Sequence, residues 1–340
     1  MKRSFFTSTL FAAVVGITIT AVLPCFVKNN YVLGLLAIVA INTIIAVGLN
    51  LVMGYAGQVS LGHAAFFGIG AYTSAILTTQ LHCNPWLALL AGVAITGIVA
   101  LTVGIPCLRL SGNYLAMATL GFGWIVYTVM VQWEQLTKGT SGISDIPKLT
   151  IGSFVFGNDI SRFYLTWAVT IALLVLSANI VNSRMGRALR ALHGSEAAAA
   201  TLGIDVAWYK IQIFVLSAAY ASIAGSLYAH TVNFISPSSY GFSFSVELVV
   251  MVVIGGMASV WGAPAGAATI TLLAEWLSGM GEKISVLKDC EVIVNGLILI
   301  LVMVFMPAGL VCGIRDLFRR AARKPMPAVA PPPTERGVLP

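Results

Sequence analysis

An apolar, glycine-rich stretch at residues 50–75 carries the uncharged polar side chains Asn50, Gln58, Ser60 and His63. Amides, hydroxyls and a neutral imidazole can exchange hydrogen bonds with a passing solute without a fixed charge. Such groups are costly in hydrocarbon unless they face protein or a water-filled cavity. We therefore take these four residues as candidates for lining a translocation pathway.

The same stretch is interrupted by three glycines, Gly54, Gly57 and Gly62. A glycine costs about 1 kcal/mol relative to alanine inside a helix, so the cluster predicts a broken membrane segment of the kind found beside transport pathways. After the break, small residues recur at every fourth position, at Ser60, Ala64 and Gly68. That spacing also suits tight helix packing with no solute contact. Spacing alone leaves both interpretations open, and the second half of the stretch either spans or re-enters.

The elements that carry these residues are membrane helices. Of the 340 residues, 58% are hydrophobic and 9% are charged, and no Asp, Glu, Lys or Arg occurs between Lys28 and Arg109. Repeated apolar runs predict an all-α polytopic membrane protein with about ten helices, eight to ten being compatible with the pattern. We place the spans at about 5–23, 31–53, 62–80, 86–107, 114–133, 163–182, 211–231, 243–261, 264–281 and 292–311.

The distribution of basic residues predicts the topology. With ten spans, thirteen of the nineteen Lys and Arg residues fall on the side of the N-terminus. That excess marks the side as cytoplasmic, with both termini there. The net charge of +7 is therefore explained by topology rather than by nucleic acid. The five cysteines form no C-x-x-C pair and predict no metal site.

We expect one transmembrane domain over residues 1–315, with an external loop at 134–162 and a cytoplasmic loop at 183–210. The proline-rich tail at 316–340 has a composition typical of disordered segments. Glu247 and Glu275 are the acids within predicted spans, and both fall near external helix ends. That depth favours an interfacial or docking role over a proton relay.

The cytoplasmic loop contains the signals of a short helix. Ser195 is a good N-cap, Glu196 follows where its charge suits the helix dipole, and Ala197 begins a run of strong helix formers. Gly203 predicts the end of this helix after about two turns. Arg187 and Arg190 precede it. Two interpretations remain open: a coupling helix that docks on a cytoplasmic motor subunit, or a connector whose arginines lie near lipid headgroups.

A second glycine-rich region predicts a tight cytoplasmic turn between two spans. It contains Gly255, Gly256, Gly262 and Pro264. Small residues at four-residue spacing allow close helix packing, and proline limits regular helix.

Five motifs carry a resemblance to a known family. They are GLNLVMGYAGQVSLGHAAFFGIGAY at 48–72, LTKGTSGI at 136–143, GRALRALHGSEAAAATLGID at 186–205, IGGMASVWGAPAGA at 254–267 and LILILVMVFMPAGLV at 297–311. In this order they resemble LivM-type permeases, membrane subunits of ATP-binding cassette (ABC) importers for branched-chain amino acids. Two departures are His193-Gly194, where the family commonly has a basic-acidic pair, and Ala258, where glycine is usual. We expect slightly looser packing at Ala258.

The resemblance implies the ABC importer permease fold in a bacterial inner membrane, and it places Arg187, Arg190, Ser195, Glu196, Ala197 and Gly203 in the loop that contacts an ATPase. It also implies a LivH-like second permease subunit, two cytoplasmic ABC ATPases that hold ATP and Mg²⁺, and a periplasmic binding protein. The chain itself has no phosphate-binding loop and no hydrolase motif, so we expect no cofactor on it and no enzymatic activity. Import of leucine, isoleucine and valine is the main interpretation. The alternatives are urea or short amides on the same machinery, or an ion-coupled carrier; a channel or a membrane enzyme fits less well.

Overall fold

The part of the chain described by the computed structural model is mostly helical, and its longest connection is at residues 138–158. It comprises residues 29–281, except 111, 152 and 153, together with the isolated positions 16, 18, 20 and 24. The predicted span at 292–311 with its motif, the tail at 316–340 and most of the predicted span at 5–23 lie outside these residues. In chain order the helices are α2 (Asn30–Asn50), α3 (His63–Thr79), α4 (Pro85–Cys107), α5 (Asn113–Gln132), α6 (Glu134–Thr137), α7 (Asp159–Asn182), α8 (Arg184–Gly194), α9 (Glu196–Thr201), α10 (Val206–Val232), α11 (Phe242–Gly255) and α12 (Gly262–Gly281).

Local capping explains where several of these helices begin. The side chain of Asn84 accepts a hydrogen bond from the Trp86 amide, and Pro85 occupies the first helical position of α4, where no amide hydrogen is needed. Asp205 caps α10 by accepting a hydrogen bond from the Trp208 amide. Five described helical segments are long and apolar enough to cross a membrane: Asn30–Tyr55, Pro85–Cys107, Asn113–Gln132, Asp159–Asn182 and Val206–Val232. The predicted span at 243–261 is wrong at its C-terminal end, because α11 stops at Gly255.

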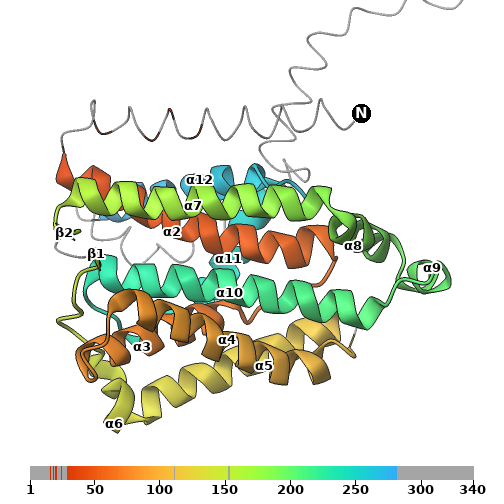
Figure 1. Cartoon of the computed structure of the whole chain (residues 1–340), viewed down its shortest axis with the longest axis horizontal. Coiled ribbons are helices and arrows are strands. Elements are labelled where there is room, and N and C mark those ends of the chain that lie inside the picture. The colour runs from red at the N-terminus through yellow and green to blue at the C-terminus, as the bar shows by residue number, and fades with distance from the viewer. Residues whose placement is uncertain are drawn as a thin grey trace, which may run out of the picture.

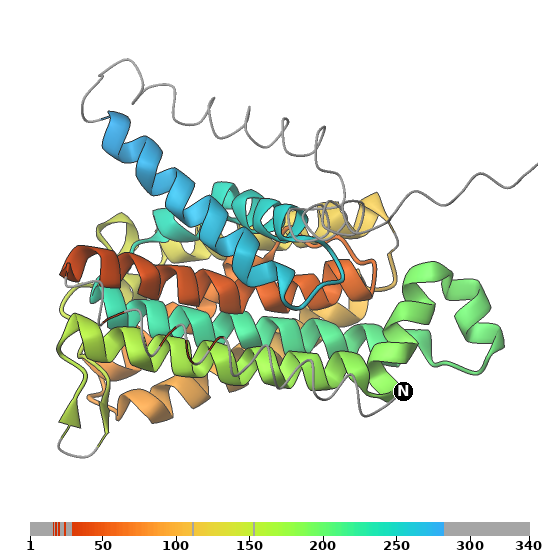
Figure 2. The ribbon, with the colours of Figure 1, turned by 90° about the horizontal axis from the view of Figure 1, so that it is seen from above.

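The long helices lie side by side with their axes roughly aligned (Figure 1). At one end of the bundle, α8 and α9 project beyond the long helices; we call this the α9 end. At the opposite end lies an antiparallel hairpin of two-residue strands, β1 (Thr150–Ile151) and β2 (Phe154–Val155); we call this the hairpin end. Seen from above, α12 crosses over α2 at an angle (Figure 2).

Helices α2 and α10 form the centre of the bundle, and both are apolar around most of their circumference, as buried helices are. The crossing of α3 and α10 depends on two glycines. A Cβ on Gly225 would clash with the Phe67 carbonyl oxygen, and a Cβ on Gly70 would clash with the backbone of Ser222. Small residues thus let these two backbones approach closely. The four-residue stripe of Ser60, Ala64 and Gly68 is not the closest contact between α3 and α10.

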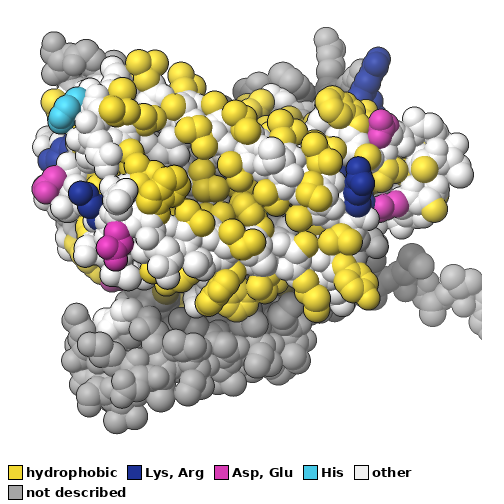
Figure 3. Space-filling view, turned by 90° about the horizontal axis from the view of Figure 1, so that it is seen from below, with side chains coloured by type: hydrophobic (Ala, Val, Ile, Leu, Met, Phe, Trp, Pro, Cys, Tyr) yellow, Lys and Arg dark blue, Asp and Glu magenta, His cyan; other side chains and the backbone are white. Residues whose placement is uncertain are grey.

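Helices α4 and α5 lie on the outside and expose apolar side chains such as Leu90, Ile98, Trp124 and Ile125. In the space-filling view, hydrophobic side chains fill the middle of the face, and charged side chains gather towards its two ends (Figure 3). This distribution matches a protein whose middle lies in hydrocarbon and whose ends lie in water.

Candidate functional site

The opening stretch is a broken helix. Helix α2 continues into one turn of π-helix, Leu51–Tyr55, and the chain then runs without helix to Gly62. Gly57 adopts a φ of +68°, a left-handed conformation that glycine reaches at little cost. A Cβ on Gly54 would clash with the side chain of Asn50, so the break also requires glycine for space.

Helix α3 begins inside the bundle rather than at its surface. The Leu61 amide donates to the Thr119 hydroxyl at 3.0 Å, and a Cβ on Gly62 would lie 2.5 Å from the Thr119 carbonyl oxygen. The His63 ring contacts Ser217, which lies eleven residues, or about 16 Å, beyond the start of α10. Non-helical backbone at such a depth is tolerated when it is enclosed by protein.

His63 joins the start of α3 to α10 through two hydroxyls. Its Nδ1 lies 3.0 Å from the Ser60 Oγ, and its Nε2 lies 2.5 Å from the Ser217 Oγ. A second buried histidine, His230, was not singled out in the sequence. Its Nε2 lies 2.9 Å from the Ser74 Oγ, and its Nδ1 lies 2.6 Å from the Pro147 carbonyl oxygen. Both histidines therefore tie helices together across the bundle.

Asn50 links the break to the turn between α11 and α12. Its Nδ2 donates to the Ser259 carbonyl oxygen at 2.8 Å, and its Oδ1 accepts from the Ala258 amide at 3.1 Å. Gln58 is different, because both atoms of its buried side-chain amide lack a hydrogen-bond partner in the part of the chain that the structure describes. Its exposed fraction is only 4%. Of the four candidate pathway residues, Gln58 alone keeps its full hydrogen-bonding capacity unused. All four are buried in this conformation, none above the exposure of Gln58.

The turn after α11 is tightly packed, contrary to the looser packing expected from Ala258. A Cβ on Gly255 would clash with the Gly262 carbonyl oxygen, and the converse holds for Gly262 and the Gly255 carbonyl oxygen. Gly256 has a φ of +106° and Ala258 a φ of +58°. The effect of alanine in place of glycine at position 258 is therefore on backbone conformation and not on packing. An L-residue here occupies a backbone region that glycine prefers. Pro264 lies in the first turn of α12, where its missing amide hydrogen is not needed.

Helices α8 and α9 form the projecting part of the α9 end. Ser195 caps α9 by accepting from the Ala198 amide at 3.3 Å, and α9 ends where expected, with Gly203 at a φ of +78°. Glu196 forms an ion pair with Lys210 at the start of α10, with 2.5 Å between Oε1 and Nζ. The Lys210 side chain is only 6% exposed, whereas that of Glu196 is 48% exposed. This pair fixes the first turn of α9 to α10.

Helix α8 was not predicted from the sequence. It buries Leu189 and Leu192 and exposes Arg187, and Arg190 donates from Nη1 to the Val181 carbonyl oxygen at 3.1 Å. The signal that could have revealed it is this amphipathic spacing between the Ser183 cap and Gly194.

Helix α8 also touches the broken stretch. A Cβ on Gly57 would lie 2.9 Å from the Nδ1 of His193. Two of the segments singled out in the sequence, the break and the loop, are thus in direct contact. Ala197 is exposed on α9. Within the described residues, no group of three or more His, Cys, Asp or Glu side chains could hold a metal ion.

Comparison with known proteins identifies one family over most of the chain. The family described as "branched-chain amino acid transport system / permease component" matches residues 31–304. The high-affinity branched-chain amino acid transport system permease protein LivM of Escherichia coli K12 is 31% identical over 319 residues, which cover 87% of this chain and 73% of LivM. The corresponding permease protein LivH of the same strain is 29% identical, covering 78% of this chain and 90% of LivH. The ribose import permease protein RbsC of Haemophilus influenzae is 26% identical, covering 77% of this chain and 78% of RbsC. No solved structure matches the chain.

Proposed function

This chain belongs to the permease components of branched-chain amino acid transport systems, and on that premise we propose that it is a membrane-spanning subunit of an ABC importer for leucine, isoleucine and valine. The observation that carries the proposal is the family match over residues 31–304, which includes the broken stretch and the α8–α9 loop. A LivH-like permease would complete the membrane part, since relatives named LivM and LivH both match this chain.

In the proposed importer the α9 end is cytoplasmic and α9 docks on an ATPase subunit, which holds ATP and Mg²⁺. The basic residues of the loop, Arg187 and Arg190 among them, support this orientation through the positive-inside rule. A periplasmic binding protein would deliver substrate to the hairpin end. The transmembrane domain would extend to about residue 315, in an inner membrane.

The contacts suggest how movement of α9 would reach the interior. Glu196 holds Lys210, and Ser217 lies seven residues farther along α10, about two turns away on the same face. Ser217 contacts His63 at the start of α3. A second connection runs from His193 to Gly57. Displacement of α9 would therefore act on both sides of the broken stretch, where Gln58 has unused hydrogen-bonding groups.

The neutral character of the broken stretch supports a small substrate that is held only transiently. Asn50, Gln58, Ser60 and His63 provide hydrogen-bonding groups and no carboxylate or ammonium. We assign Gln58 the leading role in contacting solute, because the other three already have protein partners. The same chemistry suits urea or short amides.

A transport assay tests the proposal. Proteoliposomes would contain this chain, a LivH-like permease, the ATPase subunits and the binding protein, with labelled leucine outside and ATP inside. We expect uptake that requires both ATP and the binding protein. Uptake that ignores ATP and follows a proton gradient would refute the importer and support an ion-coupled carrier. ATP-dependent uptake of urea in place of leucine would retain the machinery and change the substrate.

A further inference from the structure

A cavity at the hairpin end combines both signs of charge with an apolar wall. Its volume is about 390 Å³, and it lies where the ends of α2, α7, α10 and α12 meet. The charged groups that line it are Asp159, Arg162 and Glu275, and Asn30 also lines it. Leu35 and Ile38 continue the lining along α2. This size is within the range of small-molecule sites in proteins.

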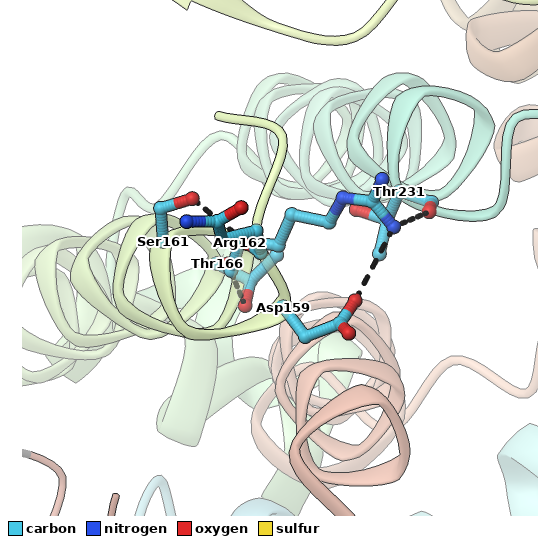
Figure 4. Close-up of polar contacts among 6 residues, drawn as sticks. Asp159, Ser161, Arg162, Thr166 and Thr231 are labelled. Carbon is cyan, nitrogen blue, oxygen red and sulfur yellow. Dashed lines mark hydrogen bonds and ion pairs between the residues drawn. The ribbon is translucent and has the colours of Figure 1, made fainter. Parts of the chain in front are cut away.

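Arg162 is the central group, and its hydrogen-bonding capacity is only partly used (Figure 4). Its Nη1 donates to the Thr231 carbonyl oxygen at 3.3 Å and lies 3.6 Å from the Asp159 Oδ1. Its Nε is buried and has no partner among the described residues, and the side chain is only 18% exposed. A guanidinium has five N–H donors in a planar fork that suits a carboxylate or phosphate. A largely buried guanidinium with one long ion pair is therefore suited to accept a further anion.

The two carboxylates, Asp159 and Glu275, favour a cation in the cavity. One oxygen of Asp159 makes the long contact with Arg162, and Glu275 forms no ion pair with any described residue. Glu275 comes from α12, on the other side of α2 from α7, and faces the same cavity. A ligand that carried only an anion would meet both carboxylates, and one that carried only a cation would meet Arg162. A ligand with both charges satisfies all three groups.

We propose that this cavity binds a zwitterion that has an acidic group, a primary ammonium and an apolar portion. The acidic group would pair with the Nε side of Arg162, the ammonium would lie between Asp159 and Glu275, and the apolar portion would contact Leu35 and Ile38. Two sources share this chemistry: a free amino acid, and the headgroup of phosphatidylethanolamine with its acyl chains. This cavity is separate from the broken stretch, so a ligand can bind in it whether or not the chain transports that ligand.

The first test measures binding to the full-length chain in nanodiscs of phosphatidylcholine and phosphatidylglycerol, without ATPase or binding protein. For the amino-acid source, we expect saturable binding of labelled leucine. Leucinamide lacks the carboxylate and 4-methylpentanoate lacks the ammonium, so neither should compete as leucine does. Equal competition by either compound would overturn the proposed recognition of both charges.

The second test concerns the lipid source. The chain would be purified from nanodiscs that contain phosphatidylethanolamine, and retained lipid would be counted by native mass spectrometry. Phosphatidylcholine is the matched comparison, because its quaternary ammonium has no N–H to donate. Preferential retention of phosphatidylethanolamine would support the proposal, and the absence of both leucine binding and lipid retention would overturn it.

Variants locate the site. Arg162→Gln should weaken binding at least tenfold, since a charge-assisted pair is lost. Glu275→Gln should weaken it severalfold, and it breaks no ion pair among the described residues, so it keeps the test available if Arg162→Gln does not fold. Lys148→Gln removes an exposed charge near the same end and should leave binding unchanged. Equal binding by Arg162→Gln, Glu275→Gln and the unaltered chain would overturn the assignment.

Discussion

Replacing Glu196 with glutamine should release α9 from α10 while leaving the rest of the bundle intact. The change keeps the size of the side chain and removes its charge. Lys210 then remains with an ammonium that is 6% exposed and has no other acidic partner among the described residues. The Lys210 ammonium can gain water as a new hydrogen-bond partner if the first turn of α9 moves away.

The magnitude follows from the unequal exposure of the two side chains. Breaking a fully buried ion pair costs about 3–5 kcal/mol, and exposed pairs contribute about 0.2–1 kcal/mol. Since Glu196 is 48% exposed, water screens one side of the pair, and we expect an intermediate cost of about 1–2 kcal/mol. That corresponds to a change of about 5- to 30-fold in the population of released α9. Lys210→Met in the same chain removes the unpaired charge and should restore part of the loss.

Amide hydrogen exchange measures the population of released α9 directly. Amides at 197–202 should exchange about 5- to 30-fold faster in Glu196→Gln, and those in the middle of α10 should be unaffected. ATP-dependent uptake by the reconstituted complex should fall in parallel. Glu134→Gln, at the hairpin end, is the matched control. Exchange within twofold of the unaltered chain, or a Glu196→Gln/Lys210→Met double variant no better than Glu196→Gln alone, would refute the argument that this pair holds α9 in place.

Three further changes test other parts of the structure. Ala258→Gly should stabilise the chain by about 1–2 kcal/mol, seen as a higher unfolding midpoint, because it relieves a left-handed conformation at a φ of +58°; an unchanged midpoint would contradict this. Gly225→Ala should destabilise the α3–α10 crossing by about 1–3 kcal/mol through the clash with Phe67, whereas Gly97→Ala, whose new Cβ would have no described atom within 4 Å, should be neutral or mildly stabilising. Gln58→Leu should raise stability by about 1–3 kcal/mol, because it removes a buried amide that has no partner among the described residues, and it should also lower uptake; normal uptake would exclude Gln58 from solute contact.

Helix ends were predictable where a single side chain decides them. Asn84 and Pro85 start α4, Ser195 starts α9 and Asp205 starts α10, each through a hydrogen bond or conformational preference local to the sequence. The break after Asn50 was predictable for the same reason, since clustered glycines act locally. These features depend on neighbours within four residues, so one sequence contains the necessary information.

Other features depend on residues far apart in the chain. The pairing of His63 with Ser217, the contact of Gly57 with His193 and the cavity shared by Arg162 and Glu275 arise only when the helices pack. The sequence suggested that Asn50 lines the translocation pathway. In the structure its side-chain amide instead forms hydrogen bonds with the backbone of Ala258 and Ser259. Polar residues in apolar helices can indicate either a pathway or a packing bond, and only their partners distinguish the two.

The internal start of α3 has a consequence for the order in which the chain is assembled. His63 and its partner Ser217 are 154 residues apart, so at 5–20 residues per second about 8–30 s of synthesis separate them. Until α10 emerges, the first turn of α3 has no hydroxyl from α10 to bond, and a helix of 17 residues, about 26 Å long, just falls short of the bilayer core. Helix α3 therefore leaves the ribosome early, but its contact with α10 can form only after α10 has been made.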